Sequence, residues 1–252
     1  MLHFERHGSG APLVLVHGIT ESLRAWDPLL DALSANHDVV ALDLRGHGTS
    51  PAGGPYDVLS LAADVHEVVT SLGVDGPLLV GHSLGATVVS AYAAMFASVG
   101  VLNLDQPLRL SGFQASLQSL EPMLRGDRAS FEAAMTMVFN SMRGQLDDPQ
   151  WARLGALRRF DQDVVLAIWS SVFELEPADL EAMVESMTRA IAVPYLAVCG
   201  TDPGEGYEQW LTALVPDAIV QRWEGRGHYP HLVEPERFLA ALAEFEGSIA
   251  GT

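Results

Sequence analysis

The chain contains no lysine. All 14 of its basic residues are arginine, and they stand against 32 acidic residues, which gives a formal net charge of −18. A Walker A phosphate loop, a pyridoxal phosphate Schiff base and a lysine imine mechanism each need a primary amine on a side chain, so the sequence excludes all three. The acidity also argues against nucleic acid and anionic membranes as partners, because binding to a phosphate backbone depends on basic patches that release counterions.

Cysteine and long apolar runs are also scarce. Cys199 is the only cysteine, so the chain cannot form an internal disulfide or a CxxC metal knuckle. The segment from Met1 to His7 is polar and charged where a signal peptide needs an apolar stretch, and no run of about 18 apolar residues follows it. We therefore expect a cytoplasmic protein that does not bind membranes.

Apolar residues are abundant and regularly arranged. They make up 48% of the 252 residues, enough for the core of one domain, or of one domain with an insertion. Short apolar runs alternate with segments of helical period, which predicts an α/β fold with a mostly parallel central sheet and helices on both faces. The expected strands are a leading antiparallel one at 2–5 and others at 13–16, 39–42, 78–80, 99–104, 195–198 and 218–223. The expected helices of this part span 23–34, 58–72, 84–96, 207–214 and 235–245.

The alternation of strands and helices stops between Gln106 and Ala190. This stretch shows helical patterns only, at 113–124, 130–142, 163–173 and 177–191. We expect a helical cap over residues 106–190, inserted into a core formed by residues 1–105 and 191–252. Such a cap would cover the carboxyl edge of the sheet, where open α/β sheets bind their ligands.

The motif with the clearest chemistry is Gly81-His82-Ser83-Leu84-Gly85, a G-x-S-x-G sequence between a predicted strand and a predicted helix. In that context the motif predicts a nucleophile elbow, in which the glycines let strand and helix pass closely and the serine is lifted above the sheet. The amide of Leu84 then points into the same space, at the positive end of the helix dipole.

A serine hydroxyl needs a base, and the base needs a partner that fixes its tautomer. His228 is the best candidate for the base, because it lies in a glycine-rich loop between the last predicted strand and the last predicted helix. Asp105 and Asp202 each follow a predicted strand, and the chain order Ser, acid, His fits either of them. His231 forms H-x-x-H with His228, but no third ligand lies near it in sequence, so we expect no metal site and no cofactor.

These motifs resemble those of the α/β-hydrolase superfamily, in its capped form with a serine nucleophile. The sequence His17-Gly18-Ile19-Thr20 resembles the family's HG loop, and 43–50 (DLRGHGTS) resembles its DxRGxGxS turn. The segment 227–238 resembles its histidine loop and last helix. The resemblance covers the core and implies Ser83 as nucleophile, His228 as base, and the amides of Ile19 and Leu84 as the oxyanion hole.

The sequence departs from the family at the acid. Members commonly carry G-x-x-D-x-x-x-P after this strand, whereas here Asp202 comes one residue earlier, in Gly200-Thr201-Asp202-Pro203. We expect Asp202 to be the acid, because its strand is the family's usual location and a helix and a strand fit between it and His228. Asp105 is the reserve, since some members place the acid after the earlier strand.

The expected reaction is hydrolysis of a small to medium, largely apolar carboxylic ester or lactone through an acyl-enzyme. Carbon–carbon bond hydrolases and cofactor-free perhydrolases share the same triad, and a ligand-receptor protein of this fold is a third alternative. Six of the eight methionines lie in the expected cap (Met123, Met135, Met137, Met142, Met183 and Met187), which suits either a pliable apolar pocket or the cap's own core. The sequence leaves a homodimer open.

Overall fold

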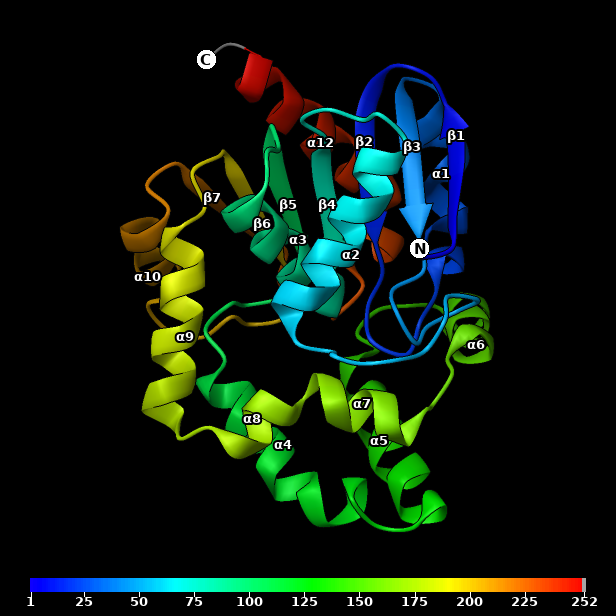
Figure 1. Cartoon of the computed structure of the whole chain (residues 1–252), viewed down its shortest axis with the longest axis vertical. Helices are drawn as coiled ribbons and strands as arrows, with labels where there is room; N and C mark the ends of the chain where they lie inside the picture. The colour runs from blue at the N-terminus through cyan, green and yellow to red at the C-terminus, as the bar shows by residue number, and fades with distance from the viewer. Residues whose placement is uncertain (251–252) are drawn as a thin grey trace.

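A computed structural model describes residues 1–250 of the chain and contains, within them, one seven-stranded sheet (Figure 1). The order of the strands across the sheet is β1-β3-β2-β4-β5-β6-β7. Their bounds are β1 Phe4–Gly8, β2 Ala11–Val16, β3 His37–Leu42, β4 Leu78–His82, β5 Gly100–Leu104, β6 Tyr195–Cys199 and β7 Ala218–Arg222. Each predicted strand is present, with ends that differ by up to three residues.

The sheet is parallel except at its edge. The first strand, β1, pairs antiparallel with β3, and the other neighbouring strands pair parallel. The carboxyl ends of β4, β5, β6 and β7 therefore lie at the same side of the sheet. The predicted α/β fold with a mostly parallel sheet is confirmed.

Helices cover both faces of the sheet because the strands are apolar on both sides. In β2, Val14 and Val16 pack into one hydrophobic cluster, while Leu13 and Leu15 pack into the other. The first cluster includes helices α2, α3 and α10, and the second includes α1 and α12 (Figure 1). These helices are α1 Asp27–Ser34, preceded by a 3-10 turn at Leu23–Trp26, α2 Val58–Ser71, α3 Leu84–Met95, α10 Tyr207–Leu214 and α12 Pro235–Ala250. A short α11, Pro230–Val233, precedes α12.

Between β5 and β6, within residues 1–250, the chain forms six helices, which we call the inserted helices. In Figure 1 most of them lie beyond the carboxyl edge of the sheet, and α9 rises along its side. They are α4 Ser111–Leu124, α5 Arg128–Met142, α6 Asp148–Leu157, α7 Gln162–Ile168, α8 Ser170–Glu174 and α9 Pro177–Arg189. A division of the chain into two domains at residues 106 and 190 stays a prediction.

The sequence patterns missed two features of this region. Helix α6 was not predicted because it buries a single residue, Leu154, and so shows little apolar periodicity. The predicted helix at 163–173 is two helices, because α7 ends at Ile168 and the next residue, Trp169, has a ψ of 7°, outside the α-helical range. Among the helices of residues 1–250, none is long and apolar enough to span a membrane.

Two glycines let β4, α3 and β2 approach one another at the sheet's carboxyl edge. A Cβ atom on Gly85 would lie 2.1 Å from the carbonyl oxygen of Val16, and one on Gly81 would lie 2.3 Å from the carbonyl oxygen of Gly85. Both neighbours are main-chain atoms, which cannot move aside as a side chain can. The G-x-S-x-G glycines are therefore required by the packing of helix on strand.

We predict that Gly85→Ala destabilises the protein by about 3 kcal/mol or more, because the new methyl group collides with the backbone of β2. For a chain of this length, the melting temperature should fall by about 6–12 °C or more. The matched control is Gly155→Ala in α6, where nothing lies within 4 Å of the added Cβ. Thermal melts followed by circular dichroism would test this, and equal melting temperatures for the two variants would contradict it.

Candidate active site

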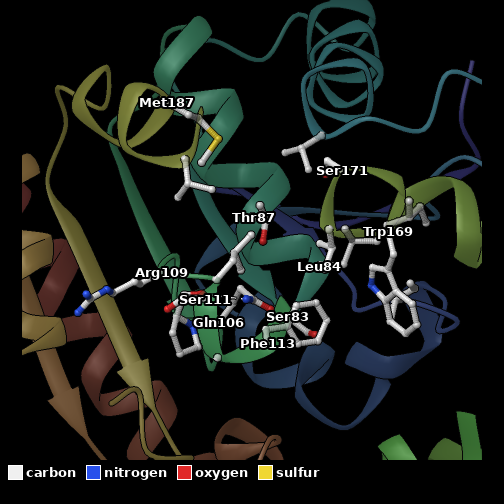
Figure 2. A pocket seen from close by; sticks show the side chains of 18 of the residues that line it. Ser83, Leu84, Thr87, Gln106, Arg109, Ser111, Phe113, Trp169, Ser171 and Met187 are labelled. Atoms are coloured by element: carbon white, nitrogen blue, oxygen red, sulfur yellow. Dashed lines mark hydrogen bonds between the residues drawn. The ribbon is translucent and has the colours of Figure 1, made fainter. Parts of the chain in front are cut away.

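Ser83 sits at a strained turn between β4 and α3. Its φ is 52° and its ψ is −122°, a backbone conformation that residues other than glycine rarely adopt. The amide of Ser83 donates to the carbonyl of Leu104 at 3.1 Å, which fixes the turn to the end of β5. The side chain of Ser83 lines a large cavity between the sheet edge and the inserted helices, as Figure 2 shows. Within residues 1–250 its hydroxyl makes no hydrogen bond to protein.

The amides expected to form an oxyanion hole flank Ser83. Leu84 is the first residue of α3, so its N–H has no acceptor within the helix. On the other side, a Cβ atom on Gly18 would lie 3.3 Å from the Cβ of Ser83, which places the loop of Gly18 and Ile19 directly beside the serine. Ile19 and Leu84 both line the cavity. Both residues therefore lie beside Ser83, and an oxyanion hole made of their amides stays a prediction.

His17 fixes the loop that carries Ile19. Its Nδ1–H donates to the carbonyl of Gly18 at 2.7 Å, and its Nε2 accepts from the amide of Leu44 at 3.0 Å. The ring is fully buried, and this burial lowers its pKa, so that the neutral form with one donor and one acceptor is favoured. His17 is therefore a structural hydrogen-bonding residue.

His228 is paired with Asp105. The Nδ1–H of His228 donates to Oδ2 of Asp105 at 2.8 Å, and both side chains are buried. The other carboxylate oxygen, Oδ1, accepts from the amides of Gly200 and Thr201, each at 2.7 Å, and Thr201 adds its hydroxyl. Burial acts to raise the pKa of Asp105, but the hydrogen bonds from His228 and Thr201 outweigh it, so the pKa lies below its ordinary value.

The expectation that Asp202 is the partner of His228 is wrong as to geometry. The Asp202 side chain is 84% exposed, and it accepts only from the amide of Gly204 and, at 3.4 Å, from Arg222. Strands β5 and β6 are neighbours, so a carboxylate after either one starts close to the histidine loop. Asp105 follows β5 at once, whereas Asp202 stands three residues after β6 and beyond the amides that bind Asp105. Asp105, the reserve candidate, is the carboxylate that pairs with Nδ1 of His228.

Glu21 is a buried charged residue that sequence reasoning did not single out. It is 1% exposed; its Oε1 accepts from the hydroxyl of Tyr229 at 2.8 Å, and its Oε2 lies 3.6 Å from Nδ1 of His82. Burial acts to raise its pKa, but His82 and Tyr229 outweigh this and hold the pKa far below its ordinary value. The only sequence signal was a carboxylate three residues after Gly18.

His82 connects this glutamate to the histidine loop. Its Nε2–H donates to the main-chain carbonyl of His228 at 2.7 Å. His82, the residue before Ser83, therefore holds the main chain of His228 in place. Glu21, His82 and Tyr229 thus join three segments: the HG loop, the elbow and the histidine loop. His82 does not line the cavity.

Trp26 and His231 are two buried residues that do not line the cavity. Trp26 is fully buried and its ring lies beside that of His231, with centroids 5.2 Å apart and the planes tilted by 38°, so it anchors its helical turn. His231 is also buried and does not line the cavity with His228. Within residues 1–250, no group of three or more His, Cys, Asp or Glu side chains is placed to hold a metal ion.

The cavity has a volume of about 1040 Å³ and is lined mainly by apolar side chains. Ser83, Asp105 and His228 line it from the sheet edge, and Phe113, Trp169 and Met187 line it from the segment between β5 and β6. Figure 2 shows Ser83, Phe113, Trp169 and Met187 around this space. Three of the methionines noted in the sequence line it, namely Met142, Met183 and Met187. Of the other three, Met135 is fully buried away from the cavity and Met137 is exposed. Some of these methionines therefore line an apolar pocket and Met135 packs in a hydrophobic core, so each of the two expectations for them holds in part.

We predict that Asp105 makes folding sensitive to acid. Because its folded pKa is depressed, its contribution to stability is present above the unfolded value of about 3.9 and is lost as the pH falls below it. In Asp105→Asn, the loss of unfolding free energy between pH 5 and pH 3 should be shallower, by at most about 1.4 kcal/mol per pH unit.

Urea unfolding at several pH values would measure this slope. The matched control is Asp202→Asn, whose side chain is exposed and should leave the slope as in the unmodified protein. A slope that changes in the control and stays unchanged in Asp105→Asn would contradict the prediction.

Comparison with known proteins agrees with this architecture. Residues 13–241 match the model of a family described as the alpha/beta hydrolase family. The chain is 33% identical to a protein of Azorhizobium caulinodans named "Putative carbamate hydrolase RutD". The alignment has 267 positions and covers 98% of this chain and 96% of the relative.

Two other matches are weaker: one covers only part of each chain, and the other covers nearly the whole chain at lower sequence identity. A soluble epoxide hydrolase of Corynebacterium sp. is 40% identical over 94 residues, which cover 36% of this chain but only 32% of that relative's length. The crystal structure of an esterase from Rhodococcus sp. superposes with a TM-score of 0.72 at 25% identity, covering 98% of this chain and 94% of that one. From the family match over most of its length, the chain belongs to the alpha/beta hydrolase family.

Proposed function

We propose that the protein is a serine hydrolase that cleaves a small to medium, largely apolar carboxylic ester or lactone through an acyl-enzyme. The observation that carries the proposal is that Ser83 and His228 face one cavity while His228 is held by the buried carboxylate of Asp105. A nucleophile, a base and an orienting acid are the minimum set for acyl transfer by serine.

In the proposed mechanism, Oγ of Ser83 attacks the substrate carbonyl and Nε2 of His228 takes its proton. Asp105 keeps the proton of the resting imidazole on Nδ1, which leaves Nε2 free as the base, and it stabilises the imidazolium that forms. The carbonyl oxygen becomes negative in the tetrahedral intermediate, and the amides of Ile19 and Leu84 would stabilise that charge.

The second half of the reaction uses the same groups. His228 donates its proton to the leaving alcohol oxygen, and a water molecule that it then deprotonates attacks the acyl group on Ser83. Collapse of the second tetrahedral intermediate releases the acid and returns the proton to the serine oxygen. The apolar lining of the cavity supports a substrate whose groups beyond the carbonyl are largely uncharged.

We expect Ser83→Ala and His228→Ala to abolish hydrolysis of p-nitrophenyl esters, because each removes a group that forms or activates the nucleophile. A labelled fluorophosphonate should modify the unmodified protein and fail to modify Ser83→Ala. Turnover at the unmodified rate by folded Ser83→Ala would overturn the proposal.

We expect Asp105→Asn to lower kcat by about 10⁴, because the histidine would adopt the wrong tautomer. Asp202→Asn is the matched control and should retain activity, because its side chain is 84% exposed and makes no hydrogen bond to His228. Circular dichroism would establish that both variants are folded. The opposite pattern, loss in Asp202→Asn only, would return the acid to its sequence-predicted position.

A panel of esters, lactones and carbamates, assayed with the same protein, would assign the substrate class. Carbamates belong in it because the Azorhizobium relative is named for carbamate cleavage. Turnover of a vinylogous diketone or of peroxide with a carboxylic acid, with no ester hydrolysis, would favour the carbon–carbon hydrolase or the perhydrolase. Tight ligand binding with turnover slower than dissociation would favour the receptor.

A further inference from the structure

The histidine loop leaves the edge of the sheet, so few sheet contacts hold it. The strand before it, β7, is the last in the sheet and within residues 1–250 pairs only with β6. Loops in such places are among the more mobile parts of a fold unless other contacts fix them. In the proposed mechanism, however, His228 must keep one ring nitrogen on Asp105 and present the other to Ser83. The contacts that fix this loop therefore bear directly on the reaction.

Both main-chain polar groups of His228 are bonded, each to a different segment. Its N–H donates to the carbonyl of Met142 at 3.0 Å, and Met142 is the last residue of α5, one of the inserted helices. Its carbonyl accepts from Nε2–H of His82 at 2.7 Å, at the nucleophile elbow. The residue that carries the base is thus held between the inserted helices and the elbow.

The turn after α5 packs against the histidine loop, main chain on main chain. A Cβ atom on Gly144 would lie 2.4 Å from Cα of Gly227, and one on Gly227 would lie 2.4 Å from Cα of Gly144. Both glycines have a positive φ, 58° for Gly144 and 75° for Gly227. No side chain fits between the two segments, so the insertion contacts the histidine loop directly.

Tyr229, the residue after the base, joins two charged groups through its hydroxyl. The side chain is 1% exposed. Its O–H donates to Oε1 of Glu21 at 2.8 Å, and its oxygen accepts from Nη2 of Arg158 at 3.0 Å. Burial and the Glu21 carboxylate raise the pKa of this hydroxyl well above its ordinary value, so it keeps the proton that it donates. One hydroxyl therefore connects the HG loop, the histidine loop and the insertion.

Aromatic rings fix the direction of Arg158. The residue follows α6 directly, and its Cζ lies 4.1 Å from the ring centroid of Phe139 and 4.3 Å from that of Trp151. Guanidinium groups are attracted to aromatic faces, and their planar shape limits the freedom that is lost when they donate. Arg158 is therefore oriented to donate to Tyr229 and to place a positive charge near Glu21.

These residues act on the site from outside the cavity. Within residues 1–250, none of Glu21, Arg158 and Tyr229 lines the space beside Ser83. The ring of Tyr229 does meet the ring of His228 edge to face, with centroids 5.4 Å apart. An effect of Glu21 or Arg158 on turnover must therefore pass through the position of His228 and not through contact with substrate.

We propose that Arg158, Tyr229 and Glu21 are positioning residues for the base, with the hydroxyl of Tyr229 as their common contact. By holding Tyr229 they keep the imidazole of His228 aligned with its carboxylate partner and with the nucleophile. Through Arg158, the inserted helices are then part of the machinery of hydrolysis and not only a cover for the cavity. This inference rests on the proposed function and adds three residues to it.

The first test removes only the common hydroxyl. In Tyr229→Phe the ring stays and both hydrogen bonds are lost, so kcat for p-nitrophenyl butyrate should fall by about 10–100-fold. KM should stay unchanged, because no group that contacts substrate is removed. An unchanged kcat, with or without a raised KM, would overturn the proposal.

Tyr207→Phe is the matched control. Tyr207 is also fully buried, and its hydroxyl accepts from the amide of Leu108 at 3.2 Å; within residues 1–250 it makes no hydrogen bond to the histidine loop. Its loss should lower the melting temperature as the loss of the Tyr229 hydroxyl does, while kcat stays as in the unmodified protein. Equal losses of kcat in the two variants would show a general effect of lower stability and would contradict a positioning role.

A double-mutant cycle tests whether Arg158 acts through Tyr229. Arg158→Met removes the donor and should lower kcat by about tenfold, but in the Tyr229→Phe background it should change kcat by less than about threefold, because the hydrogen bond is already absent. Glu21→Gln, which keeps the shape of the side chain and removes its charge, should behave in the same way. Arg159→Met, which changes the exposed neighbouring arginine, should leave kcat unchanged in both backgrounds. Losses that multiply with those of Tyr229→Phe would overturn the proposed connection.

A measurement on the resting protein separates this inference from the proposed function. The proton between Nδ1 of His228 and Oδ2 of Asp105 should give a downfield proton NMR signal, which His228→Ala lacks. The signal should weaken in Tyr229→Phe, through faster exchange with water, and should stay unchanged in Tyr207→Phe. This pattern without turnover of any ester would overturn the function and leave the positioning of His228. Ester turnover with kcat and signal both unchanged in Tyr229→Phe would overturn the inference and leave the function.

Discussion

Ser83 holds a backbone conformation that is unfavourable for any residue with a side chain, and the surrounding contacts leave it no alternative. The strand before it and the helix after it approach so closely that Gly81 and Gly85 have no room for a Cβ atom. The helix itself rests on the carboxyl end of β2 through Gly85. The free energy stored in the turn is therefore supplied by the packing of α3 on the sheet, and the serine is held out from the surface as a result.

The same packing determines where the other groups of the site can stand. Because α3 lies against β2, the loop after β2 comes beside the serine, and it brings Ile19 and Glu21 with it. Glu21 and His82 then reach the histidine loop through Tyr229 and the carbonyl of His228. A buried carboxylate is costly unless hydrogen-bonded, and these partners lower that cost while joining segments that lie far apart in the sequence.

The fold was predictable from the sequence because its strands are short apolar runs and its helices have clear apolar faces. Ser83 and His228 were predictable for a different reason, since glycines and breakers mark the turns that present them. The acid was not, because Asp105 and Asp202 both follow strands, and only the pairing of β5 with β6 decides which carboxylate meets the ring. Glu21 gave no periodic signal, and α6 buries too little apolar surface to show one. What the sequence could not specify was the contact between distant loops.

The walls of the cavity are encoded in separate parts of the chain. One wall is α3, which begins at the nucleophile and is constrained by the sheet, while the other is α9, which lies in the insertion and carries none of Ser83, Asp105 and His228. Substitutions on the cavity face of α9 can reshape the space without disturbing the strained turn. Selection can therefore act on the two walls independently, with α9 free to drift toward new ligands while α3 is kept unchanged by the demands of the elbow.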